Sequence, residues 1–105
     1  MTTLEGPRHL MMQSLATSLA DRARAAARDC RMHTSSWHFY HGVEAAATHV
    51  LHPETAAVRE GTSWIDREGP SFREGFTKAS TLLAGAAAMR EPPLQVTLPE
   101  PDMPT

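Results

Sequence analysis

Four of the six histidines of this 105-residue chain lie within one short stretch. They are His38, His41, His49 and His52. Placed on a helix that turns ~100° per residue, the four fall within an arc of roughly 80°. The apolar residues of the stretch centre on the opposite face, and they are Phe39, Val43, Ala46, Ala47 and Val50. The histidine face therefore points away from the surface that this helix would bury.

Imidazole is a common ligand of Zn, Ni, Cu and haem iron, so this face is a candidate transition-metal or haem site. His38 with His41, and His49 with His52, have the i,i+3 spacing that lets two rings meet. A rise of ~1.5 Å per residue separates His38 from His52 by about 21 Å, so the four cannot share one ion. The face thus offers two half-sites that need further ligands. The alternative is a polar face that meets solvent or a partner.

Arg28 and His33 form an Arg-x4-His pair. The spacing resembles that of the HEPN-type helical ribonucleases, and the resemblance implies RNA cleavage at a dimer interface. Five positions on a straight helix turn two side chains ~140° apart, so the pair converges only if the helix ends near Met32. The alternative is a surface arginine and an interhelical histidine.

Other catalytic patterns are absent from the sequence. It contains no nucleophile elbow, glycine-rich phosphate loop, Walker lysine or dinucleotide fingerprint. The single cysteine, Cys30, falls on an apolar stripe, so we expect it in the core rather than in a reactive site. These observations favour a protein that is not an enzyme.

Composition limits the class of protein and its partners. Hydrophobic residues make up 41% of the chain and charged residues 21%, as in ordinary globular domains. The net charge of -2 lacks the basic footprint of a nucleic-acid-binding protein. The arginine-rich, alanine-rich composition is typical of a high-GC bacterium. The lone cysteine, the lack of a signal-peptide pattern and the lack of a long apolar run predict a cytoplasmic protein without a membrane partner.

Apolar residues at three- and four-residue steps predict a first helix from Pro7 to about His33. Two continuations are open. Either Ser36 caps a separate second helix, or one helix continues in phase to about Leu51. We expect the break, and Pro53 stops either helix.

Three further elements are expected after this proline. A short helix is predicted over Glu54–Glu60, and a single turn starts at Ser63-x-x-Asp66. The clearest start signal is Ser71-x-x-Glu74, which resembles a capping box and precedes an apolar stripe. This last helix is expected to run to about Arg90.

The sequence therefore predicts an all-α fold, a small bundle or hairpin of two to four helices that homodimerisation completes. Alanine-rich stripes with few aromatic residues bury modest area, which is why self-association is expected. The predicted helical domain spans residues 1–90. Residues 91–105 form a proline-rich, acidic tail that is extended or disordered, buries little area and is available to a partner. The predicted function is that of a small interaction or accessory protein that associates with itself or docks to another protein.

Overall fold

The structure is a computed structural model that describes residues 5–52, 69–91 and 93–102. The described ranges contain three helices and no strand, so the predicted all-α helical bundle is confirmed. The short helix expected over Glu54–Glu60 and the turn expected at Ser63–Asp66 lie outside the described residues.

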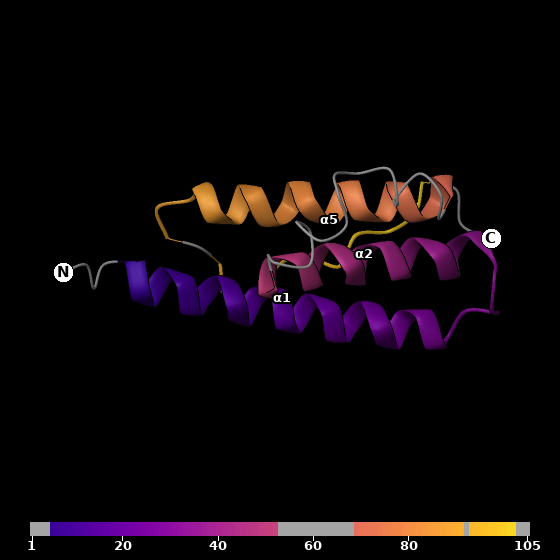
Figure 1. Cartoon of the computed structure of the whole chain (residues 1–105), viewed down its shortest axis with the longest axis horizontal. Helices are drawn as coiled ribbons and strands as arrows, with labels where there is room; N and C mark the ends of the chain where they lie inside the picture. Colours follow the sequence, from indigo (N-terminus) through magenta and orange to yellow (C-terminus); the bar gives the residue numbers. More distant parts are fainter. Residues whose placement is uncertain (1–4, 53–68, 92, 103–105) are drawn as a thin grey trace.

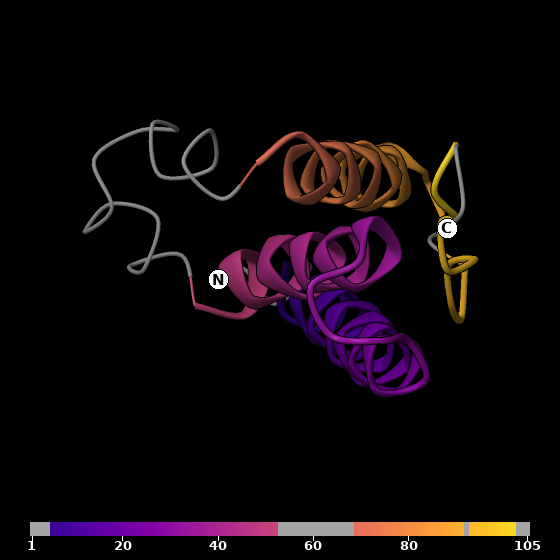
Figure 2. The same ribbon diagram turned by 90° about the vertical axis from the view of Figure 1, so that its right-hand side faces the viewer.

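The three helices are α1 (Glu5–Arg28), α2 (Ser35–Leu51) and α5 (Pro70–Ala88). Helix α1 runs antiparallel to α2, whereas α2 and α5 run in the same direction (Figure 1). Helix α2 packs along both of the others, which touch each other little. Seen along the bundle, α1 and α5 diverge from α2 and leave one side between them open (Figure 2). This open side positions the candidate site described below.

The predicted break between the first two helices is present, but its cap is Thr34 rather than Ser36. The Oγ1 of Thr34 accepts a hydrogen bond from the amide of Trp37 at 3.3 Å and donates one to the carbonyl of Arg31 at 2.7 Å. The same hydroxyl therefore closes the turn and starts α2. Ser36 lies inside the helix and is buried. Helix α1 ends at Arg28, five positions before the predicted His33.

The predicted capping box at the start of α5 is also wrong. Gly69 is the N-cap, with a φ of 105° and no side-chain cap bond, and Pro70 is the first helical residue. Proline lacks an amide hydrogen and suits the first turn of a helix, so α5 starts before Ser71. The carboxylate of Glu74 instead lies 3.2 Å from the Nζ of Lys78.

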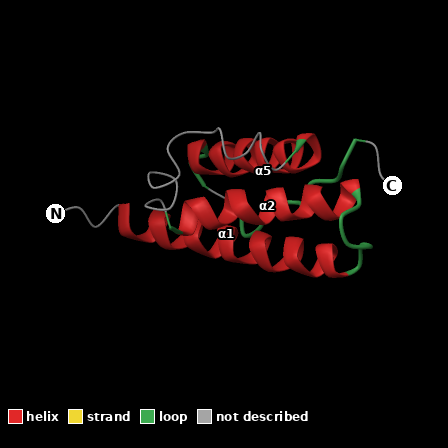
Figure 3. Cartoon of the chain, turned by 45° about the vertical axis from the view of Figure 1, so that its right-hand side comes forward, coloured by secondary structure: helices red, strands yellow, loops and turns green. Residues whose placement is uncertain are grey.

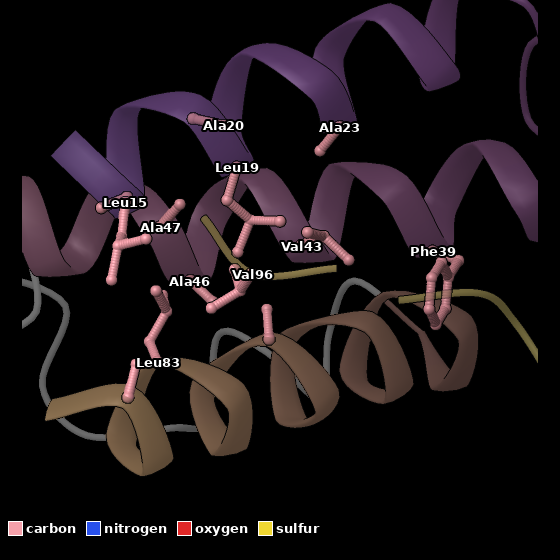
Figure 4. Close-up of a cluster of buried hydrophobic side chains, with 13 residues drawn as sticks. Leu15, Leu19, Ala20, Ala23, Phe39, Val43, Ala46, Ala47, Leu83 and Val96 are labelled. Carbon is pink, nitrogen blue, oxygen red and sulfur yellow. The ribbon is translucent and has the colours of Figure 1, made fainter. Parts of the chain in front are cut away.

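The core consists of short side chains from all three helices. Its largest fully buried members are Phe39, Leu15, Leu19 and Val43. Ala46 and Ala47 of the predicted apolar face of α2 are buried beside them (Figure 4). The alanines let the helix axes approach closely, because they add little volume between the backbones.

Helices α2 and α5 approach each other closely at a glycine of each helix. A methyl group added to Gly42 would stand 2.1 Å from the carbonyl oxygen of Phe72. A methyl group added to Gly75 would stand 2.0 Å from the carbonyl oxygen of Phe39. Both distances are far shorter than a van der Waals contact, which is roughly 3.5–4.0 Å between carbon atoms. Only glycine therefore fits at either position.

Residues 93–102, which follow α5, lie in no helix or strand, and part of this segment is buried, whereas the sequence predicted that the tail buries little area. It runs along the open side of the bundle (Figures 2 and 3). Val96 is only 8% exposed and lies between α1 and α5 in the core (Figure 4). Leu98 is half-buried against the same core. The divergence of α1 and α5 creates this space, and single-sequence periodicity gives no sign of it.

Candidate functional site

Three imidazole rings surround the indole of Trp37 in the first turn of α2. The ring centroids of His33, His38 and His41 lie 4.9, 5.0 and 4.2 Å from that of Trp37. The centroids of His33 and His38 are 6.0 Å apart. We call His33, Trp37, His38 and His41 the Trp37 cluster. The first predicted histidine pair thus lies beside a tryptophan and a third histidine.

The sequence analysis singled out His33 only as the partner of Arg28 and did not group it with the other histidines, because this residue lies in the turn and not on the histidine face of α2. Its φ is 67°, in the left-handed region that residues other than glycine seldom adopt. This conformation turns the chain back, so that the ring meets Trp37 and His38. The signal in the sequence that could have placed His33 beside the helix was a turn followed by a threonine cap.

Glu44 connects the Trp37 cluster to α1. Its Oε1 lies 3.6 Å from the Nδ1 of His41. Its Oε2 accepts a hydrogen bond from the Nε of Arg24 at 2.9 Å and forms an ion pair with the Nη2 of the same arginine at 2.8 Å. Arg24 also pairs with Asp21 at 3.1 Å. The hydrogen bond and charge of Glu44 raise the pKa of Arg24, so this guanidinium stays protonated.

The second predicted pair, His49 and His52, has two different environments. The ring of His49 lies 5.4 Å from that of Phe76 on α5. His49 also lines an apolar hollow of about 390 Å³ with Met12 and Val50. His52 is exposed at the C-cap of α2, where its amide donates a hydrogen bond to the carbonyl of Thr48. One histidine therefore faces α5, and the other lies at the helix end.

Within residues 5–52, 69–91 and 93–102, no group of three or more His, Cys, Asp or Glu side chains is arranged to hold one metal ion. The four predicted ligands therefore do not form a closed site of the structural-zinc kind, which takes four protein ligands. Any ion at the Trp37 cluster would need water molecules among its ligands. The metal assignment of the histidine face stays a prediction.

Arg28 and His33, the pair that resembles the HEPN spacing, lie at the end of α1 and in the following turn. Both side chains are exposed. The ring of His33 contacts the rings of Trp37 and His38. The ribonuclease alternative stays a prediction, and no contact in the described part of the chain supports it.

A pocket of about 340 Å³ lies where the α1–α2 turn meets the C-terminal segment. It is lined by Asp29, Cys30, Arg31, Thr34, Ser36, Tyr40, Glu100 and Pro101. Cys30 is half-buried, and its Sγ lies 3.3 Å from the carbonyl oxygen of Ala26. Burial, and then the charges of Cys30 and Glu100, raise the pKa of the Tyr40 hydroxyl. The pocket brings the end of the C-terminal segment beside the single cysteine.

The C-terminal segment is fastened at its far end by three charged side chains, Glu74, Lys78 and Asp102, which we call the Lys78 clasp. The Nζ of Lys78 donates to the Oδ1 of Asp102 at 2.6 Å and to the carbonyl of Glu100 at 2.9 Å. The amide of Asp102 donates to the Oε2 of Glu74 at 2.8 Å. The hydrogen bond with Asp102 raises the pKa of Lys78, and the same bond lowers the pKa of Asp102.

Two contacts of different kinds therefore hold the segment in the space between α1 and α5, which we call the tail groove. Val96 is an apolar anchor in the core, and Asp102 is an ionic anchor on α5. Between them an open cleft of about 510 Å³ separates the segment from α5, with Leu82, Leu98 and Pro99 in its wall. The arrangement is that of an extended segment docked on a helical surface.

Comparison with protein-family models, curated proteins and solved structures gives no match to this chain. None of the helices in the described ranges is both long enough and apolar enough to span a bilayer. The tail groove and the Trp37 cluster are therefore the features of the molecule that point to a function.

Proposed function

We propose that this chain is a helical interaction protein that associates with a second copy by exchanging residues 93–102. The observation that supports the proposal is the burial of Val96 between α1 and α5, in a segment that belongs to no helix or sheet. Side-chain anchors hold this segment in the way that a groove holds a bound extended peptide. Exchange of an identical element between two copies is a common route to a dimer.

The contacts of the tail groove do not depend on which copy supplies the segment. Val96 fills the same space, and Asp102 meets the same lysine, whether the segment arrives from its own α5 or from that of another chain. The energy of docking is therefore nearly the same in both arrangements. Concentration then sets the balance, because exchange converts an intramolecular contact into an intermolecular one.

The connection out of α5 also favours exchange. Helix α5 ends at Ala88, and the sequence places Pro92 and Pro93 before Val96. Proline lacks an amide hydrogen and fixes φ, so the connection cannot extend the helix and resists tight folding. A stiff proline-containing connection is able to carry the segment to a neighbouring copy.

Light scattering across a range of protein concentrations tests the proposal. We expect the fraction of dimer to rise with concentration for the full chain. Val96→Asp should reduce that fraction strongly, because it places a charge in the apolar part of the groove. Leu94→Ser is the matched control, since Leu94 is 92% exposed and should leave the dimer unchanged. A monomer at every concentration, or a dimer that Val96→Asp leaves intact, would contradict the proposal.

A further inference from the structure

The Trp37 cluster contains a pair of neighbouring histidines, only one of which belongs to the histidine face of α2. His33 lies in the turn before the helix, and His38 lies in the first turns of the helix. Their ring centroids are 6.0 Å apart with an interplanar angle of 44°. Two imidazoles on one ion, each with a metal–nitrogen distance of about 2.1 Å and roughly 90–120° apart, place their ring centroids roughly 4.5–5.5 Å apart. The pair is therefore close to the spacing that a shared ion requires.

The backbone holds one member of the pair in an unusual conformation. The φ of His33 is 67°, and non-glycine residues in this region are uncommon and carry a cost in energy. The ring of His33 packs at 4.9 Å on Trp37, which also packs at 5.0 Å on His38. The indole thus contacts both imidazoles, and these contacts reduce the side-chain entropy that remains to be lost when an ion binds.

The third imidazole of the cluster is placed differently. His41 lies 4.2 Å from Trp37, and its Nδ1 is 3.6 Å from the Oε1 of Glu44. Glu44 in turn accepts a hydrogen bond from the Nε of Arg24 of α1 and forms an ion pair with its Nη2. This connection directs His41 toward α1, and no set of three ligands for one ion exists in the described ranges.

We infer that His33 and His38 together bind one Cu²⁺ or Zn²⁺ ion, with water molecules as the remaining ligands. Imidazole nitrogen suits both ions, and copper binds such ligands more tightly than zinc does. The inference is independent of tail exchange, because neither histidine lines the tail groove or belongs to the Lys78 clasp. It also differs from the half-sites of the sequence, which paired His38 with His41 and His49 with His52.

Calorimetric titration of untagged chain with Cu²⁺, and separately with Zn²⁺, tests this site. We expect one ion per chain with micromolar affinity for Cu²⁺. His33→Ala and His38→Ala should each weaken binding by at least about tenfold, since each removes half of the protein ligands. His41→Ala and His49→Ala are the matched controls and should leave the affinity unchanged within about twofold. Circular dichroism of each variant establishes that it is folded.

A second measurement uses the position of Trp37. In a Trp64→Phe background Trp37 is the single tryptophan, and a Cu²⁺ ion on the neighbouring imidazoles should quench its fluorescence with the same midpoint as the heat signal. Binding weaker than millimolar in the wild-type chain would overturn the inference. Equal loss in all four histidine variants, or loss with His41→Ala but not with His33→Ala, would also overturn it.

Discussion

Gly42 of α2 and Gly75 of α5 each lie so close to the backbone of the other's helix that neither has room for a methyl group. Each α-carbon lies against a backbone carbonyl of the opposite helix, that of Phe72 or that of Phe39. Two parallel helices thus meet backbone to backbone in the half of the bundle that also carries the Lys78 clasp. This contact fixes the distance of α5 from α2 and with it the width of the tail groove.

Gly42→Ala and Gly75→Ala should both destabilise the fold. Overpacking typically costs about 1–3 kcal/mol, and the gain in helix propensity from glycine to alanine, about 1 kcal/mol, offsets only part of it. A methyl group 2.0–2.1 Å from a backbone oxygen cannot be relieved by a side-chain rotation, so we expect the upper part of that range. Thermal unfolding followed by circular dichroism measures the change.

Gly85→Ala is the control for this pair. A methyl group at Gly85 meets nothing within 4 Å, so only helix propensity should act. We expect stabilisation of about 0.5–1 kcal/mol. If Gly42→Ala and Gly75→Ala stabilised the fold as Gly85→Ala does, that result would contradict the close contact of α2 with α5.

Val96→Ala should destabilise the bundle although it lies outside every helix. The side chain is 8% exposed, and removing two buried methyl groups costs about 1–2 kcal/mol. Leu94→Ala, at an almost fully exposed position two residues earlier, should change stability by no more than about 0.5 kcal/mol. Urea unfolding of both variants decides between a docked segment and the detached tail that composition predicts. Equal stabilities would favour the detached tail.

The Lys78 clasp should make docking of the segment depend on pH at both extremes. The pKa of Asp102 is lowered from 3.8 in the folded chain, so its contribution is present above this value and is lost as pH falls through the lower folded pKa. The pKa of Lys78 is raised from 10.5, so its contribution is present below this value and is lost as pH rises through the higher folded pKa. The clasp should therefore persist between about pH 4 and pH 10.5.

Hydrogen exchange of the segment amides across this range checks the window. Protection of the Asp102 amide, which donates a hydrogen bond to Glu74, should weaken below about pH 4 in the wild-type chain, after correction for the intrinsic exchange rate. Asp102→Asn removes the titrating carboxyl, so the protection of the same amide in this variant should no longer change below about pH 4. Both effects are small because the ion pair is exposed and screened by salt. A transition of the same size in the Asn variant would assign the pH dependence to another group.

Much of the helical fold could be predicted from the sequence. The apolar stripes of α1, α2 and α5 have the helical period, and Leu15, Leu19, Val43 and Leu83 are buried where the stripes place them. The helix N-caps were harder to predict. Ser36 and Ser71 have side chains that are typical of N-caps, but Thr34 and Gly69 have the backbone geometry that an N-cap requires. Local side-chain chemistry alone does not choose between adjacent candidates.

The candidate sites were harder to predict. Helical spacing grouped His38 with His41, but a turn residue, His33, completes the cluster through a left-handed backbone conformation. The docking of Val96 depends on the divergence of α1 and α5, which is a property of three helices packed together. The composition of residues 91–105 is polar and proline-rich, and composition alone does not show that Val96 is buried.

Exchange of the C-terminal segment is tested most directly by a disulfide between Cys30 and a cysteine introduced by Pro101→Cys. Cys30 and Pro101 line the same pocket, and the chain has no other cysteine, so a bond between the two positions reports which copy supplied the segment. Oxidation followed by non-reducing electrophoresis separates a bond within one chain from a bond between two. Tail exchange predicts a cross-linked dimer whose fraction rises with protein concentration and falls in a Val96→Asp background. Cross-linked monomer alone at every concentration would contradict it.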